Sequence, residues 1–134
     1  MNKTKIDLDN DLILRSENIE YNNDTLKNIL DNLIFEDVTS QFTFTACTLD
    51  KGKIFRLGKI IFINIGVTPT ITGGWDTIIK IPNKFFPIYV AKSEKGSPII
   101  GSSFWVYGEG TGAIRGEVQS GTYKAICGYY ILQN

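Results

Sequence analysis

The sequence predicts a mainly β protein: a jelly-roll-like antiparallel β-sandwich head, preceded by a short N-terminal arm and one helix. Two observations predict this fold. After residue 40 the chain consists of short runs rich in Ile, Val, Thr and aromatic residues, separated by Gly, Pro and Ser turns at sandwich-like spacing. Before residue 40, one segment has the period of an amphipathic helix. We therefore expect an arm and helical neck over residues 1–40 and a β-sandwich head domain over residues 41–134.

The first residues of the chain are expected to form an extended arm with a polar turn. Asp7, Asp9 and Asp11 are spaced like the first ligands of a calcium-binding EF-hand loop. Leu12 stands where that loop needs glycine, and Asn18 stands where it needs the bidentate glutamate. We therefore expect a turn here, no bound metal and no cofactor.

The segment NNDTLKNILDNLIFE predicts a helix over residues 22–36. Asn22 or Asn23 can cap it, and Asp24 falls in the first turn, where the helix dipole favours a carboxylate. The apolar side chains fall at helical spacing and form one stripe: Leu26, Ile29, Leu30 and Leu33. A helix of about a dozen residues is marginal alone, so the stripe must pack on its own domain or on copies of itself.

Seven runs after residue 40 are expected to be strands: 42–48, 59–67, 75–81, 87–93, 99–107, 113–118 and 122–132. The run 59–67 is apolar on both faces. Ile60 and Phe62 lie on one side of it, and the other side carries Ile61, Ile63, Ile65 and Val67. One face must meet the core of the sandwich, and the other must meet the arm, the helix or a neighbouring subunit.

The stretch IPNKFFP links two of these runs. Proline cannot donate a hydrogen bond to a sheet ladder, so Pro82 is expected to end one strand and Pro87 to begin the next. Phe85 and Phe86 are expected to plug the end of the sandwich. This packing role accounts for the motif without a role in binding.

Composition excludes several classes of function. Lys plus Arg and Asp plus Glu number 14 each, and no basic patch predicts a nucleic-acid partner. We expect no membrane insertion and no signal peptide, because no apolar segment is long enough for the first and the initial residues are too polar for the second. The absence of histidine removes the standard catalytic triads and most zinc sites. Cys47 and Cys127 are expected to be free and buried.

The order of motifs after these first segments resembles the C-terminal head of phage tail-fibre and baseplate receptor-binding proteins. The shared pattern begins with a strand led by Gly58, in RLGKIIFINIGV, and continues with the IPNKFFP link. A hairpin with glycine at its tip follows over residues 108–112, and the last strand ends in the pair Tyr129 and Tyr130. The preceding ENIEYNNDTLKNILDNL is similar to the neck of such proteins, so the resemblance covers most of the chain from Ile19 onward.

This resemblance implies a homotrimer, joined through its necks and inner sheets, in the tail or baseplate of a phage or prophage-derived particle. The trimer would be assembled in the host cytoplasm, contact other tail or baseplate proteins and attach to a bacterial cell-surface glycan. Two alternatives stay open: a purely structural trimeric virion component with no host ligand, and a small polysaccharide hydrolase. The hydrolase would need two suitably separated acids among Asp76, Glu94, Glu109 and Glu117. We expect no enzymatic activity.

Outward-facing aromatic side chains form the candidate ligand site. In SFWVY, Phe104 and Val106 are expected to face the core, which turns Trp105 and Tyr107 outward. An indole beside carboxylates and amides can stack a sugar, because a pyranose ring presents C–H groups on one face and hydroxyls at its edge. The predicted ligand-binding residues are Trp75, Asp76, Tyr107 and Glu109. Trp105 is expected in the trimer interface, with Leu26, Ile29, Leu30 and Leu33.

Three features leave apolar surface without a partner inside one chain: the helix stripe, the second face of 59–67, and the aromatic pairs Trp105/Tyr107 and Tyr129/Tyr130. A soluble monomer seldom exposes this much contiguous apolar surface. Closed cyclic symmetry would bury all three around one axis. The resemblance, and not the apolar pattern, selects three copies over two.

Overall fold

The computed structural model describes residues 20–21, 24–25, 28, 34–89, 96–108 and 112–133. The chain divides into two compact units, Met1–Ile34 and Phe35–Asn134. In the first unit, strand β1 (Glu20–Tyr21) pairs antiparallel with strand β2 (Asp24–Thr25). The second unit contains the remaining strands and one hydrophobic core.

The predicted helix over 22–36 is wrong at both ends. Asp24 and Thr25 lie in β2, where they pair with Tyr21 and Glu20, and Glu36 lies in a strand of the second unit. Polar residues that can begin a helix are compatible with other local structures, and here Asp24 and Thr25 pair as a strand instead. Asn28 is helical. The predicted apolar stripe lies outside the described residues: Leu26, Ile29, Leu30 and Leu33.

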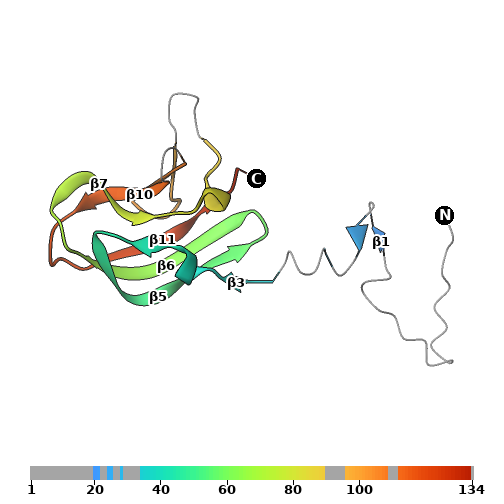
Figure 1. Cartoon of the computed structure of the whole chain (residues 1–134), viewed down its shortest axis with the longest axis horizontal. Coiled ribbons are helices and arrows are strands. Elements are labelled where there is room, and N and C mark those ends of the chain that lie inside the picture. Colours follow the sequence, from blue (N-terminus) through green and yellow to red (C-terminus); the bar gives the residue numbers. More distant parts are fainter. Residues whose placement is uncertain are drawn as a thin grey trace. The chain divides into compact units, whose positions relative to one another are not determined.

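The second unit consists of two antiparallel sheets, which share one core and are consistent with a β-sandwich (Figure 1). The five-stranded sheet has the order β4 (Thr43–Phe44), β7 (Gly73–Lys80), β10 (Ala113–Val118), β9 (Trp105–Tyr107) and β8 (Gly96–Pro98). The four-stranded sheet has the order β11 (Lys124–Ile131), β6 (Ile60–Pro69), β5 (Cys47–Leu57) and β3 (Glu36–Asp37). Two short 3-10 turns, η3 (Thr39–Gln41) and η4 (Asn83–Phe85), connect strands.

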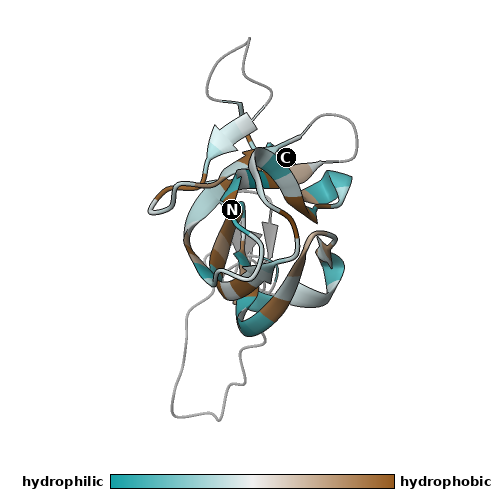
Figure 2. Cartoon of the chain, turned by 90° about the vertical axis from the view of Figure 1, so that its left-hand side faces the viewer, coloured by the Kyte–Doolittle hydropathy of each residue, from teal (hydrophilic) through white to brown (hydrophobic). Residues whose placement is uncertain are grey.

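The core lies between the inner faces of the two sheets. The predicted alternation of 59–67 is confirmed: Ile61, Ile63, Ile65 and Val67 are at most 2 % exposed, whereas Ile60 and Phe62 are half-buried on the opposite face. The five-stranded sheet contributes Ile78, Ile79, Val106 and Ile114, none of them exposed. Figure 2 shows the hydrophobic and hydrophilic segments that alternate along these strands.

The chain changes sheets at Thr45 and Ala46, and the expected single strand over 42–48 is therefore wrong. β4 ends at Phe44 in one sheet, and β5 begins at Cys47 in the other. The Thr45 and Ala46 amides both donate to the Ile78 carbonyl, at 3.0 and 3.2 Å, which holds this corner against β7. β5 then extends to Leu57 through a polar stretch that the sequence does not identify as a strand, with Gly52 in a left-handed conformation (φ 89°).

Two further predicted strands differ from the structure. The run 99–107 is not one strand, because Gly101 (φ 95°) makes a turn: Ile100 forms an isolated bridge with Tyr129, and only Trp105–Tyr107 form a strand, β9. In the run 87–93, Pro87 makes only an isolated bridge to Leu132, and Ile88 and Tyr89 are exposed. Residues 90–93 lie outside the described residues.

The IPNKFFP link closes the end of the core as expected. Phe85 is 1 % exposed and stacks on Phe42, with ring centroids 5.4 Å apart. The Phe85 carbonyl accepts a hydrogen bond of 3.0 Å from the buried Tyr130 hydroxyl, and burial raises the pKa of Tyr130. The expectation that Tyr129 and Tyr130 both face outward is wrong, because adjacent residues of a strand point to opposite faces.

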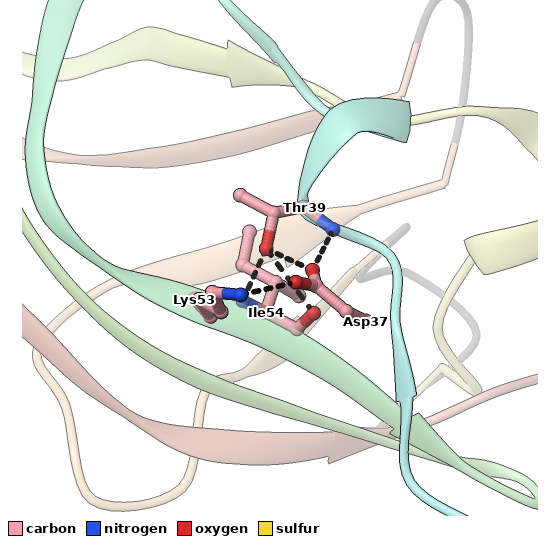
Figure 3. A network of polar contacts seen from close by, with 4 residues as sticks. All are labelled: Asp37, Thr39, Lys53 and Ile54. Atoms are coloured by element: carbon pink, nitrogen blue, oxygen red, sulfur yellow. Dashed lines mark hydrogen bonds and ion pairs between the residues drawn. The ribbon is translucent and has the colours of Figure 1, made fainter.

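A polar network fastens the start of the second unit to β5 (Figure 3). The Thr39 hydroxyl donates to Asp37 Oδ1 (2.6 Å) and accepts from the Ile54 amide (2.9 Å). The Thr39 side chain thus accepts a hydrogen bond from β5 just beyond the end of β3. Lys53 Nζ lies 2.9 Å from Asp37 Oδ2. Beside this network the side chain of Val38 is fully buried in the core. The hydrogen bonds from Thr39 and the bond from Lys53 lower the pKa of Asp37 from 3.8 to about 2.

This lowered pKa predicts a specific pH dependence of stability. The carboxylate of Asp37 binds a proton less readily when folded, so its stabilisation is complete above the unfolded pKa and is lost as pH falls through the folded value. We expect the melting temperature of wild type to drop more between pH 4 and pH 2 than that of Asp37→Asn. Glu36→Gln, on the same strand, is the control and should follow wild type. Parallel curves for wild type and Asp37→Asn would contradict the assignment.

Candidate functional site

The outer face of the five-stranded sheet carries the candidate site. Trp105 of β9 lies opposite Arg115 of β10, and Arg115 lies opposite Thr77 of β7. Directly opposed residues in an antiparallel pair share one face of the sheet. The expected alternation in SFWVY is confirmed, because Phe104 and Val106 are buried while Trp105 and Tyr107 are half-buried.

Three aromatic rings form a continuous row on this face. The rings of Trp75 and Trp105 are edge to face, with centroids 6.3 Å apart. Trp105 and Tyr107 are stacked, also at 6.3 Å. These separations lie in the range where aromatic pairs attract each other. We refer to Trp75, Trp105, Tyr107 and Arg115 together as the aromatic face.

Arg115 is held in a fixed position among these rings. Its Nε donates a hydrogen bond of 3.1 Å to Thr77 Oγ1, and its guanidinium carbon lies 5.1 Å from the centroid of the Tyr107 ring. Arginine stays ionised at any ordinary pH. Within the part of the chain that the structure describes, the ion pair is that of Lys53 and Asp37, on the other sheet. No described carboxylate forms an ion pair with Arg115.

Trp75 has an unusual backbone conformation. Its φ is 63°, and no other non-glycine residue in the described ranges has a positive φ. Bulky residues rarely adopt this left-handed conformation because Cβ crowds the backbone. The residue follows Gly73 and Gly74 where β7 and β10 lose register, and its side chain is 54 % exposed. Strain of this kind concentrates at functional positions, which makes Trp75 a candidate for ligand contact.

A shallow, open pocket of about 400 Å³ adjoins the Trp75 end of the row. Its walls come from the start of β7 with the residue before it, the end of β10 with the residue after it, and the first residue of β11: Thr72, Gly73, Gly74, Glu117, Val118, Gln119 and Lys124. The Ser120 amide donates to Thr72 Oγ1 (3.0 Å), which joins two of these walls. Asp76 lies at the rim, since a Cβ on Gly73 would collide with its carboxylate. The pocket thus places charged and amide groups at the Gly73–Gly74 segment, which immediately precedes Trp75 in the chain.

The structure brings together part of the predicted ligand site. Trp75 and Tyr107 are joined in one row by Trp105, which the sequence assigns to a trimer interface instead. Asp76 lies beside the pocket, and Glu109 is outside the described residues, as is Glu94. Sequence reasoning missed Arg115. The alternation of AIRGEV turns this residue outward, but only the pairing of β10 with β9 and β7 shows which rings surround it.

A second exposed surface lies on the outer face of the four-stranded sheet. Phe55, Phe62 and Tyr129 oppose one another across β5, β6 and β11. Phe35 covers part of this row, with ring centroids 6.1 Å from Phe55 and 5.6 Å from Phe62. Leu57, Ile60 and Ile131 form the adjacent row. We call these residues the apolar face; in it Phe35 is 56 %, Ile131 46 % and Tyr129 37 % exposed.

The two cysteines are free, as expected, but only one is buried. Cys47 donates to the Ile78 carbonyl (3.4 Å) at the corner between sheets, and burial, with a smaller contribution from Asp50, raises the pKa of its thiol to about 11. Cys127 is exposed beside Asn64, so its expected burial is wrong. The residue lies on the outer face of β11, next to buried Ile126 on the inner face.

Comparison with known proteins gives no relative from which to transfer a function. No family model, curated protein or solved structure matches the chain. Across the residues with described positions, no cluster of three His, Cys, Asp or Glu side chains is placed to hold a metal ion. Nor do those residues include a helix of the length and hydropathy needed to cross a membrane.

The strain at Trp75 predicts that Trp75→Gly has little effect on stability. Glycine relieves about 1–2 kcal/mol of left-handed strain, which offsets about 0.5–1.5 kcal/mol from the lost edge contact with Trp105. We expect the free energy of unfolding in denaturant to change by less than about 1 kcal/mol. Trp105→Gly, in an ordinary strand conformation, should cost about 2 kcal/mol or more. An equal loss in both variants would show that Trp75 is not strained.

Proposed function

We propose that this chain is a receptor-binding component of a phage tail or prophage-derived particle, which attaches to a bacterial surface saccharide through the aromatic face. The observation that supports this proposal is the row of three rings on the outer face, in which Trp75 is exposed and Trp105 and Tyr107 are half-buried. Sugar rings present C–H groups that pack on aromatic faces, while their hydroxyls need hydrogen-bonding groups at the edge. The pocket beside Trp75 offers such groups from Glu117, Gln119 and Lys124.

The placement of the row on strands supports binding by a preformed surface. Trp105 and Tyr107 belong to β9, whose inner residue Val106 is fully buried, so the core fixes the outward direction of both rings. Sites built on regular elements lose less entropy on binding than sites on loops. An open platform of this kind suits an extended polymer, which can lie across several rings at once.

We infer recognition and not hydrolysis. A glycosidase needs two carboxyl groups on either side of one glycosidic bond, about 5–10 Å apart. Of the described candidates, Glu117 lines the shallow pocket and Asp76 lies at its rim. Neither side chain is buried, so nothing in their surroundings distinguishes one of them as the proton donor that a glycosidase needs.

We further propose that the chain forms a homotrimer within the virion, with a jelly-roll-like head that other tail or baseplate proteins hold in place. The apolar face supports this assembly, because it has two adjacent rows of apolar side chains with Phe35, Tyr129 and Ile131 exposed, and contiguous apolar patches on a surface mark interaction sites. The same face favours one alternative function, a purely structural trimeric component that binds no host ligand. The two functions differ in whether the aromatic face has a ligand.

Binding to immobilised bacterial cell-wall polysaccharides tests the function. We expect wild type to bind at least one polysaccharide of a broad panel, and we expect Trp75→Gly and Tyr107→Ala each to weaken that binding about tenfold, the loss of one ring contact of roughly 1.4 kcal/mol. Tyr123→Ala, which removes an exposed ring near Gly66 on the other sheet, is the matched control. Failure of the wild-type trimer to bind any polysaccharide would favour the structural alternative.

Light scattering tests the assembly. We expect a particle of three times the 15.0 kDa chain mass in dilute solution. Phe35→Lys with Ile131→Lys should give a folded monomer, because both side chains are exposed in the single chain and only an interface would desolvate the new charges. Tyr123→Lys changes a comparably exposed residue near Gly66, outside the apolar face, and should leave the trimer intact. A wild-type monomer at micromolar concentration would contradict the proposal.

A further inference from the structure

We propose that the saccharide bound by the aromatic face is acidic, and that Arg115 binds its carboxylate or phosphate group. This inference rests on the proposed function and adds the chemical class of the ligand. The site holds one positive charge, that of Arg115, without a described partner for it. Arg115 is exposed, and the described residues give its terminal guanidinium nitrogens no hydrogen-bond or ion-pair partner.

The position of Arg115 differs from that of an ordinary surface arginine. The bond from Nε to Thr77 and the contact with Tyr107 use one edge and one face of the guanidinium group. The remaining edge carries the terminal N–H groups, which can bind a carboxylate or phosphate in a bidentate manner. Because the side chain is already ordered, an anion that binds there loses less rotamer entropy than one that binds a free arginine.

Charges on this sheet are arranged along the row of rings. At the Tyr107 end, Lys80 lies opposite Ala113, which lies opposite Tyr107, so a second cation shares the face with Arg115. The carboxylates of Asp76 and Glu117 lie at the Trp75 end, around the pocket that Lys124 also lines. The chain as a whole has no net charge, so the cations near Tyr107 are a local feature. An acidic sugar would therefore place its anion at the Tyr107 end and its hydroxyls toward the pocket.

Chemical removal of charge from the polysaccharide tests this inference directly. Each cell-wall polysaccharide that wild type binds is assayed again after reduction of its carboxyl groups to hydroxymethyl groups, and separately after removal of phosphate with hydrogen fluoride. We expect one treatment to weaken binding about tenfold to a hundredfold, the effect of losing one charge-assisted contact. The treatment that acts identifies the anion as carboxylate or phosphate.

Variants assign the effect to Arg115. Arg115→Gln should reduce affinity for the untreated polysaccharide as much as the effective chemical treatment does, and the treatment should then have no further effect. The affinity of Arg115→Lys should lie between those of Arg115→Gln and wild type, because lysine keeps the charge but not the bidentate edge. Arg56→Gln is the matched control, since Arg56 is held in a similar way, through its Nε and the Gly58 carbonyl (2.9 Å), but lies on β5 of the other sheet.

A measurement on wild type alone keeps the test independent of variant folding. Affinity for the untreated polysaccharide should fall as salt rises from 20 to about 500 mM, and affinity for the charge-depleted form should not. Binding that neither treatment, salt nor Arg115→Gln weakens would overturn the acidic assignment and leave the proposed function standing. A complete absence of polysaccharide binding by wild type would overturn the proposed function itself.

Discussion

Burial of one face of β6 is the constraint on which the rest of the structure depends. Ile61, Ile63, Ile65 and Val67 are removed from water between the two sheets, and β6 pairs along its length with both β5 and β11. Since a strand alternates its side chains, this burial also fixes what faces out. Phe62 is turned outward by the same register and meets Phe55 and Tyr129. The register that buries the core side chains of β6 therefore also determines which side chains form the apolar face.

The sequence predicts the parts of this fold that depend on alternation within one strand. The inward set of β6 and the outward Trp105 and Tyr107 follow from spacing alone. The parts that depend on tertiary pairing are not predictable in this way. The change of sheet at Thr45 is set by the carbonyl of Ile78, which is distant in sequence, and Arg115 joins the aromatic rings only through cross-strand neighbours. The helix prediction failed at its ends because Asp24, Thr25 and Glu36 are paired with strand partners, which helical spacing alone does not reveal.

The two exposed faces lie on different sheets, which separates their proposed tasks. The apolar face belongs to β11, β6 and β5, and the aromatic face belongs to β7, β10 and β9. Outer faces of two packed sheets point away from each other, so copies joined through the apolar faces would leave every aromatic face accessible. In the proposed trimer, three weak saccharide sites would bind a repetitive surface far more tightly than one site does. A shallow site on each copy would therefore be sufficient for tight attachment.

The network around Asp37 also determines how the head would respond to mechanical tension. A pull on the chain before Phe35 reaches the domain through β3, whose two residues pair only with β5. The load then passes to Thr39 and Lys53 and from there into β5, next to the central strand of its sheet. Fully buried Val38 stands behind these polar contacts as an anchor, because its extraction would open the core to water. If the proposed attachment to a cell holds, force would therefore enter this domain through the hydrogen bonds and ion pair around Asp37, next to buried Val38.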